Sequence, residues 1–288
     1  MKVWLTGEAG AVGKSFTEYC ARTRKHEFIN SLSNDEYDYW RKTSPIKTNE
    51  IDIFDPTLET IISRSEADII VHCAETHLKS EDYTIKTNIL GTYYVAEIAK
   101  KLEIPFVYIS SPDCYDISED LLSDQTCIKN NSIYTYSKNS AESLIKLMLD
   151  DYRIIVPGYL YGPHDDNGYI ARLIKSHFGK SDSVKMNIDP ESPKSFLYMD
   201  DFMNLLDTVI SEEYPRKIKI NACYPVYYSY SDVLACLEEQ GLSPEFDFSV
   251  KKDVVKTRKL LNSNIDWQPS IDLHEGIEKT VEWISKTL

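Results

Sequence analysis

A tyrosine and a lysine four residues apart offer the means to move a proton. Tyr134 and Lys138 begin and end the run Tyr-Thr-Tyr-Ser-Lys, and in a helix this spacing puts both side chains on one face. Lowering a phenol pKa from its usual value near 10 by about three units takes roughly 4 kcal/mol of preferential stabilisation of the phenolate. The Lys138 ammonium and an oxidised nicotinamide could supply it. Among 20 tyrosines such a pair also arises by chance on an exposed helix face, so its position along the chain matters.

A serine stands where this pair would need it. Ser111 ends the apolar run from residue 107, which precedes the Tyr134 segment. The carboxyl ends of strands are where ligands bind in open α/β sheets, so Ser111 can offer its hydroxyl to a substrate oxygen. The alternative is a serine that caps the backbone at the end of a strand.

Three glycines follow the first apolar run at the spacing Gly-x-x-Gly-x-x-Gly. Gly7 permits a tight turn, Gly10 lets the backbone approach a pyrophosphate, and Gly13 lets a helix pack closely on the strand. A nucleoside-triphosphate loop ending at Lys14 is excluded, because that motif needs a glycine where Glu8 stands. The sequence therefore predicts a dinucleotide-binding turn.

The elements that must position these groups form an α/β pattern. Short apolar runs alternate with longer amphipathic stretches, which predicts a Rossmann-type doubly wound parallel sheet with a smaller C-terminal substrate-binding lobe. Strands are predicted at 3–6, 28–30, 68–73, 106–110 and 154–156, and helices at 11–24, 82–102, 134–149, 168–178, 200–211, 230–240 and from 273. We place a dinucleotide-binding domain at 1–156 and a mainly substrate-binding lobe at 157–288, and expect them to pack as one compact unit.

With these motifs the chain resembles the extended short-chain dehydrogenase/reductase family, in its branch of nucleotide-sugar epimerases, dehydratases and 4-keto reductases. The resemblance covers nearly the whole length. Beyond the glycine turn, Ser111 and the Tyr/Lys pair, the segments that carry it are Asp52-Ile53, Val71-His72-x-Ala74, Asn88-x-x-Gly91-Thr92, Ser110-Ser111-x-x-x-Tyr115, Tyr161-Gly162-Pro163 and Asp266-Trp267-x-Pro269.

The resemblance implies roles for individual residues. Tyr134 would be the acid/base, Lys138 would bind the nicotinamide ribose and lower the tyrosine pKa, and Ser111 would align the sugar oxygen. The implied cofactor-binding residues are Gly7, Gly10, Ala11, Val12, Gly13, Asp52, Ile53, Ala74, Tyr134, Lys138 and Pro157, with Asp52 and Ile53 flanking the adenine. We expect His72 and Asn88 to be structural.

The resemblance leaves the reaction branch open. Ala74-Glu75-Thr76-His77 is similar to a segment of dTDP-glucose 4,6-dehydratases, and Asp113 stands where that family has its second acid, but Pro112 cannot replace the first. The segment around His164 is similar to GDP-fucose synthase, and the short stretch from Lys138 to Tyr161 to dTDP-4-dehydrorhamnose reductases. His164 would then be a second acid/base, or simply an exposed turn histidine.

The leading hypothesis is an NAD(P)-dependent nucleotide-sugar epimerase/dehydratase-type oxidoreductase that transfers hydride at sugar C4, with Tyr134 as acid/base. One alternative is an NADPH-dependent nucleotide-4-keto-sugar reductase of the dTDP-4-dehydrorhamnose reductase or GDP-fucose synthase type. Another, from a different class, is a non-catalytic dinucleotide-binding sensor or assembly protein, which the departures at Pro112 and Tyr159 motivate.

The cofactor and substrate contacts follow less directly. The second strand ends at 29–33 and supplies neither an acid for the NAD ribose nor a base for the NADP phosphate, although Arg41 and Lys42 lie farther along. We expect NAD, with NADP possible. The residues considered for the nucleotide-diphosphate sugar are Tyr159, His164, Lys194, Lys251, Lys252 and Arg258, besides Ser111; many relatives place asparagine where Tyr159 stands.

Charge and composition limit the partners. The formal net charge of −14 over 288 residues argues against nucleic acid and anionic membranes. The six cysteines are scattered, so we expect reduced thiols and no metal site. No apolar run is long enough for a membrane span, and no secretion signal is visible, which predicts a cytoplasmic protein. From the resemblance we expect a homodimer that pairs through the helices from 82 and 134.

Overall fold

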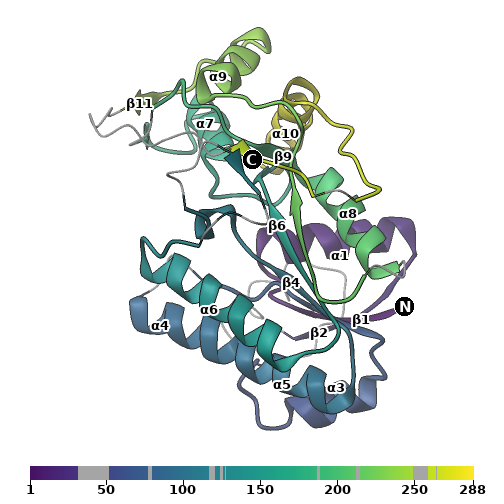
Figure 1. Ribbon diagram of the computed structural model, residues 1–288. Coiled ribbons are helices and arrows are strands. Elements are labelled where there is room, and N and C mark those ends of the chain that lie inside the picture. Colours follow the sequence, from purple (N-terminus) through teal and green to yellow (C-terminus); the bar gives the residue numbers. More distant parts are fainter. Residues whose placement is uncertain are drawn as a thin grey trace. The chain divides into compact units, whose positions relative to one another are not determined.

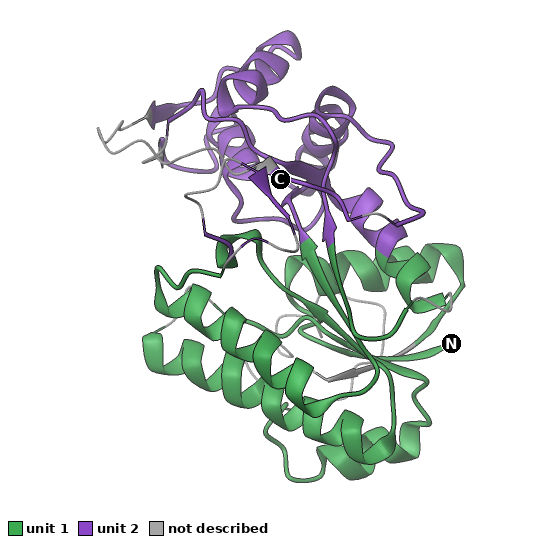
Figure 2. Ribbon diagram, in the orientation of Figure 1, with its two compact units in different colours: residues 1–114, 128–156, 206–220 green, residues 115–127, 157–205, 221–288 purple. Residues whose placement is uncertain are grey.

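The computed structural model describes residues 1–31, 52–76, 80–116, 121–123, 126, 128–186, 189–211, 215–248, 259–263 and 265–288. They form two compact units (Figure 2): unit 1 contains 1–114, 128–156 and 206–220, and unit 2 contains 115–127, 157–205 and 221–288. One boundary coincides with the predicted division after residue 156. Two further segments depart from this division. Residues 115–127 belong to unit 2, and residues 206–220 belong to unit 1, where they contribute to the sheet through β10 (Ile218–Ala222).

A twisted sheet forms the centre of unit 1 (Figure 1). Its strands are β1 (Lys2–Thr6), β2 (Glu27–Ser31), β3 (Ile69–His72), β4 (Phe106–Ile109), β6 (Tyr152–Pro157) and β10 (Ile218–Ala222), in the order β10-β6-β4-β3-β1-β2. The pairs β1–β2, β1–β3, β3–β4 and β4–β6 are parallel. The strand order reverses between β1 and β3, which is the switch point where α/β sheets bind ligands. The predicted fold class is confirmed.

Helices cover both faces of this sheet (Figure 1). They are α1 (Ala11–Thr23), α3 (Leu58–Ser65), α4 (Glu81–Ile85), a π-helical segment (Lys86–Gly91), α5 (Thr92–Leu102) and α6 (Ile133–Met148). On the face of α3, α5 and α6, apolar side chains such as Ile62, Val95 and Ile145 pack against Trp4 and Phe106 of the sheet. The single helix predicted over 82–102 is thus a helical run interrupted by a wider turn.

Unit 2 has its own apolar core and short parallel strand pairs. Its helices are α7 (Tyr169–His177), α9 (Tyr230–Glu239), α10 (Leu273–Thr287) and the first part of α8 (Met199–Ser211). The strand pairs are β7 (Tyr159–Tyr161) with β9 (Phe196–Tyr198), β8 (Val184–Met186) with β11 (Phe246–Phe248), and β5 (Leu121–Leu122) with β12 (Lys259–Leu260). Among the helices that the structure describes in either unit, none has the length and apolar character of a membrane span.

The glycine turn fixes how α1 meets the sheet. Gly7 has a φ of +73°, and a Cβ there would lie 2.5 Å from the backbone nitrogen of Ala74, which follows β3. A Cβ on Gly13 would collide with the Gly7 carbonyl oxygen and lie 2.6 Å from the Glu8 Cα. At Gly10 a Cβ would meet only the Gly7 oxygen, at 3.3 Å. Gly7 and Gly13 are therefore required by the packing of backbone on backbone, whereas Gly10 faces more open space.

Replacement of Gly13 by alanine is expected to destabilise the protein by about 2 kcal/mol, because the helix must move off the strand. The matched variant Gly10→Ala should change the free energy of unfolding by less than about 0.5 kcal/mol. Urea unfolding followed by circular dichroism measures both. Equal losses for the two variants would contradict the close approach at Gly13.

A buried carboxylate joins α6 to two strands. Glu142 accepts hydrogen bonds from the Ser110 hydroxyl after β4 (2.6 Å), from Lys219 Nζ on β10 (2.9 Å) and from Lys146 Nζ (3.2 Å), and its side chain is 1% exposed. Burial raises the pKa of Glu142, but the Lys219 charge and the Ser110 hydrogen bond outweigh burial and bring it below its usual value. The ionised carboxylate therefore fixes the helix that carries Tyr134 against the sheet.

The variant Glu142→Gln should lose about 2 kcal/mol of unfolding free energy near neutral pH, since the hydrogen bonds to charged lysines are weakened. A carboxyl with a lowered folded-state pKa stabilises the fold above its unfolded pKa near 4.5, and this contribution disappears as the pH falls through the folded value. The gap between variant and wild type should therefore narrow as the pH falls below about 4.5. Glu59→Gln, which breaks an exposed pair with Lys101, is the control. A gap that does not depend on pH would refute the assignment.

Candidate active site

The first turns of α6 present Tyr134 and Lys138 on one face, as the spacing predicts. Ser132 begins the helix: its hydroxyl accepts the Thr135 N–H at 3.1 Å, while the Thr135 hydroxyl oxygen accepts the Ser132 N–H at 3.0 Å. This reciprocal capping box fixes the first turn. Tyr134 thus lies in the capped first turn of the helix, and Lys138 one turn later is buried in the interior.

Lys138 is a charged side chain with only 2% of its surface exposed. Its Nζ donates to the Ile109 carbonyl oxygen at the end of β4 and to the Glu75 carboxylate, both at 2.6 Å, and lies 4.5 Å from the centre of the Tyr108 ring. Burial lowers the pKa of Lys138, but the negative charge of Glu75, the neighbouring phenols of Tyr108 and Tyr134 and the hydrogen bond to Glu75 together raise it well above its usual value. While paired with Glu75, the lysine is therefore a cation at the carboxyl end of β4.

Tyr134 shares the same carboxylate. Its hydroxyl donates to Glu75 Oε2 at 3.2 Å. Burial, followed by the negative charge of Glu75, raises the pKa of Tyr134, whereas the Lys138 charge and a hydrogen bond with Ser111 lower it. Lys138 therefore lowers the pKa of Tyr134, as expected, but burial and Glu75 raise it by more. The phenol is protonated in this state.

Ser111 caps the local backbone and also lies beside Tyr134. The buried Ser111 hydroxyl oxygen accepts the Asp113 N–H at 3.2 Å, which caps the short 3₁₀ turn Pro112–Cys114. The same hydroxyl interacts with Tyr134. Asp113 is half-buried in this turn. Ser111, Tyr134 and Lys138 therefore lie together, with Asp113 two residues beyond Ser111.

The backbone around Glu75 is fixed by an asparagine of the π-helical segment. Asn88 accepts the Thr76 N–H at 2.8 Å and donates to the Thr76 carbonyl at 2.9 Å and to the Ser137 hydroxyl at 2.9 Å. Asn88 thus ties the segment after β3 to α6, which is a structural role. Glu75 itself is a site residue that the analysis of the sequence misses. The available signal was a carboxylate three residues beyond the end of β3, at the sheet edge where Ser111 lies.

His72 is a buried residue that links neighbouring elements next to the site. Its ring lies between the hydroxyls of Thr6 (2.7 Å) and Thr92 (3.0 Å), and stacks near Tyr108. Burial lowers the pKa of His72 to about 3, and the nearby Lys138 charge acts in the same direction. The histidine is a neutral bridge between β1, β3 and α5, as its structural interpretation requires.

The structure describes all of the predicted cofactor-binding residues, and most of them are in unit 1. The amino terminus of α1 begins after Gly10, and Ala11 and Val12 are half-buried in its first turn. The Ala74 N–H donates to the Thr6 hydroxyl at 3.4 Å. Asp52 Oδ1 accepts the Phe54 N–H at 2.9 Å and so caps its own turn, and Ile53 packs against the core beside Gly91. Pro157 ends β6.

The predicted substrate residues of unit 2 lie on β7 and the loops around it. Lys194 is 5% exposed, and its Nζ lies 5.3 Å from the ring centre of Tyr159 and 5.9 Å from that of Tyr230. Burial lowers the pKa of Lys194. His164 has a φ of +64° and packs its ring against Trp283, so it is not a freely exposed turn residue.

Next to His164, burial raises the pKa of Asp165 to about 6, a signal that the sequence does not carry. The remaining predicted cations, and the histidine of the dehydratase-like segment, lie outside the described residues: Arg41, Lys42, His77, Lys251, Lys252 and Arg258.

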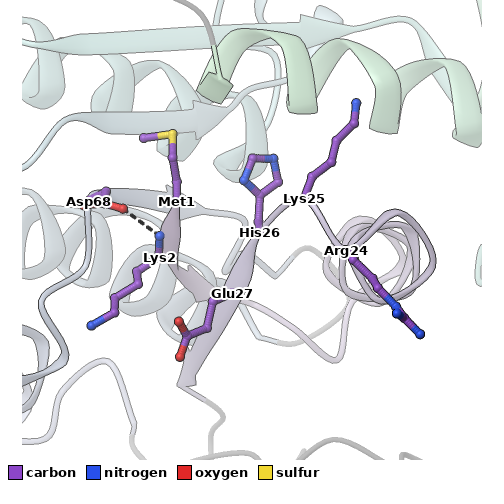
Figure 3. Close-up of a pocket in the computed structure, with 7 residues that line it drawn as sticks. All are labelled: Met1, Lys2, Arg24, Lys25, His26, Glu27 and Asp68. Atoms are coloured by element: carbon purple, nitrogen blue, oxygen red, sulfur yellow. Dashed lines mark hydrogen bonds between the residues drawn. The ribbon is translucent and has the colours of Figure 1, made fainter.

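A hollow at the opposite edge of the sheet is a different feature. It is lined by Met1, Lys2, Arg24, Lys25, His26, Glu27 and Asp68 (Figure 3). Asp207 pairs with Lys25 at 2.5 Å and with His26 at 2.7 Å, and Glu66 pairs with Lys2 at 2.9 Å. These contacts are at the amino ends of the strands, so the hollow is separate from the Tyr134 site.

The chain is similar to several proteins of known activity. It is 23% identical to human dTDP-D-glucose 4,6-dehydratase over 92% of this chain and 79% of that protein. It is 22% identical to GDP-L-colitose synthase of Yersinia pseudotuberculosis over 98% and 97%. The structure of UDP-glucuronic acid 4-epimerase from Bacillus cereus, solved with UDP-glucuronic acid and NAD, superposes with a TM-score of 0.84 at 18% identity over all of both chains.

The family model described as the NAD-dependent epimerase/dehydratase family matches residues 3–223. That range contains the glycine turn, Ser111, Tyr134 and Lys138, which are the motifs that suggested the resemblance. The match favours the enzymatic hypothesis over a non-catalytic dinucleotide-binding protein. The chain therefore belongs to the NAD-dependent epimerase/dehydratase family of enzymes.

Proposed function

We propose that this protein is a nucleotide-sugar epimerase or dehydratase that uses NAD to oxidise the sugar at C4, with Tyr134 as the acid/base. The observation that carries the proposal is the cluster of Tyr134, Lys138 and Ser111 at the carboxyl ends of the strands. The relatives support the substrate class, since the named dehydratase and epimerase act on a dTDP-sugar and a UDP-sugar.

The glycine turn fits the diphosphate of NAD. The missing Cβ atoms of Gly7 and Gly13 let the backbone of β1, β3 and α1 converge, and Gly10 leaves room beside the amino terminus of α1. Helix amino termini attract phosphate through their free N–H groups. We assign Gly7, Gly10, Ala11, Val12, Gly13 and Ala74 to the cofactor, with Asp52, Ile53 and Pro157 as further contacts. Bound NAD would accept the hydride from C4 and, in an epimerase, return it.

Side chains of the protein are proposed to transfer the proton of the C4 hydroxyl. Ser111 and Tyr134 are proposed to hold the C4 hydroxyl between them, and Tyr134 takes its proton as the hydride leaves. Lys138 keeps its positive charge because it is paired within the site. That charge favours the phenolate, against the opposing influences of burial and of Glu75.

The choice between epimerase and dehydratase depends on a second acid and base. Elimination of water from the sugar needs both in addition to Tyr134. Asp113 is the proposed base, and Pro112 has no titratable side chain to act as the acid. Incubation with UDP-, dTDP-, GDP- and CDP-sugars followed by mass spectrometry separates an isomer of unchanged mass from a product that has lost water. A reduced product would instead support the 4-keto-sugar reductase alternative.

Replacing Tyr134 by phenylalanine should lower turnover by about 10²–10⁴-fold, because general acid–base catalysis is lost. Folding and NAD binding should remain. Tyr136→Phe is a matched control two residues along the same helix, where the side chain is 48% exposed. Steady-state kinetics with the best nucleotide sugar measures both variants, and a Tyr134→Phe enzyme as fast as Tyr136→Phe would exclude the assigned acid/base.

Lys194 is proposed to bind the substrate diphosphate, together with Tyr159 and His164 in the same unit. A lysine that is nearly buried between aromatic rings has lost much of its hydration, which favours an anionic partner. Arg258 is a further candidate from the sequence. Tyr159 provides a ring where many relatives have an amide, so it is proposed to shape sugar selection.

Lys194→Met is expected to raise the dissociation constant of the nucleotide sugar about tenfold, which corresponds to roughly 1.4 kcal/mol. The dissociation constant of NAD should not change. Lys180→Met, which removes an exposed lysine of the same unit, serves as the control for net charge. Calorimetric titration with each ligand measures the constants; unchanged sugar binding in Lys194→Met would argue for a purely structural lysine.

We further propose a cytoplasmic homodimer. Five described cysteines are free, four of them buried, which agrees with a reducing compartment. Leu90 and Tyr94 on the helical run from 81, and Leu147 on α6, are 47%, 44% and 84% exposed. Such apolar side chains on two neighbouring helices suit contact with a second copy of the chain.

A further inference from the structure

Access to the Lys138 ammonium is controlled by one side chain. Of its three N–H groups, one is directed to the Ile109 carbonyl and one to Glu75, both at 2.6 Å, and the Tyr108 ring covers another side. The lysine side chain is 2% exposed, whereas that of Glu75 is 33% exposed. A polar ligand that is to bind Lys138 must therefore displace the Glu75 carboxylate.

Glu75 can move while its backbone remains in place. The neighbouring Thr76 is held through both its N–H and its carbonyl by Asn88. Among the described residues, the Glu75 carboxylate is hydrogen-bonded to Lys138 and Tyr134, and both partners belong to the site. Rotation about its own side-chain bonds is thus enough to release the lysine into a space that already reaches solvent.

We propose that Glu75 is a positioning residue that holds Lys138 and Tyr134 in the free enzyme and yields Lys138 to the dinucleotide when the dinucleotide binds. This inference rests on the proposed function, because it takes the ribose hydroxyls of NAD as the ligand of Lys138. The working pair of tyrosine and lysine then exists only in the loaded enzyme. A ligand that must break an ion pair binds more weakly by the free energy of that pair.

The first test is a double-mutant cycle on NAD binding, measured by isothermal titration calorimetry. Glu75→Gln should lower the dissociation constant of NAD about tenfold, because the amide keeps the shape but releases the lysine. Glu59→Gln removes the same charge from an exposed pair in the same unit and should shift the constant less than about twofold. In a Lys138→Met background, Glu75→Gln should have no effect, since its partner is gone.

Three outcomes would overturn the proposal. They are an unchanged constant in Glu75→Gln, weaker binding in that variant, and an effect that persists in full with Lys138→Met. If NAD binds the wild type too weakly to measure, the Glu75→Gln variant must bind NAD tightly enough for its dissociation constant to be measured. If it does not, the proposal is also refuted. Nucleotide-sugar turnover is scored separately with Tyr134→Phe, so a lack of turnover beside an intact binding cycle rejects the proposed function alone.

A second readout concerns the free enzyme. Removal of the Glu75 charge should lower the pKa of Tyr134, since that charge opposes the phenolate. Ultraviolet titration of phenolate absorbance in Glu75→Gln and in the wild type, each corrected with its Tyr134→Phe counterpart, isolates this one phenol among the 20 tyrosines. A pKa that does not move would show that Glu75 does not control the phenol.

Discussion

A buried ammonium requires compensation, and much of unit 1 is arranged to compensate Lys138. Transfer of a charge from water into a protein interior costs several kcal/mol unless hydrogen bonds and an opposite charge replace the lost water. The Ile109 carbonyl, the Glu75 carboxylate and the Tyr108 ring provide these at Nζ. They come from the ends of β4 and β3, so the lysine also fixes the separation of α6 from those strands. The same contacts at Lys138 therefore hold the proposed catalytic residues and pack this edge of the sheet.

Different hydrogen bonds around this lysine hold different parts of the site in place. Glu142 anchors the middle of α6 to Ser110 and Lys219, and the capping box at Ser132 fixes its start. Asn88 holds the loop that carries Glu75, and His72 fills the space beneath. Ordering backbone and side chains costs conformational entropy, which these buried hydrogen bonds help to offset during folding. Hydrogen bonds thus hold the backbone of the site, while the part-exposed carboxylate of Glu75 contacts Lys138 and Tyr134.

Regular periodicity made the main elements predictable, and contacts between distant segments were not. The positions of Tyr134 and Lys138 on one helix face follow from 3.6 residues per turn, and the turn at Gly7 follows from its place after an apolar strand. Glu75 meets Lys138 across 63 residues, a contact that depends on β3 and β4 being neighbours. No predicted strand corresponds to β10, and pairs as short as β5 with β12 carry too few residues to show alternation.

The π-helical segment Lys86–Gly91 changes the direction in which the side chains after it point. A wider turn inserts an extra residue into the ladder and rotates everything downstream around the axis. Asn88 lies within this segment and Thr92 directly after it, and each meets an inward-facing polar group, one at Thr76 and one at His72. The pattern of buried and exposed residues before the wider turn is therefore out of step with the pattern after it. If this helix were aligned without a gap with a homologous helix that lacks the wider turn, solvent-facing positions would be matched with interior ones.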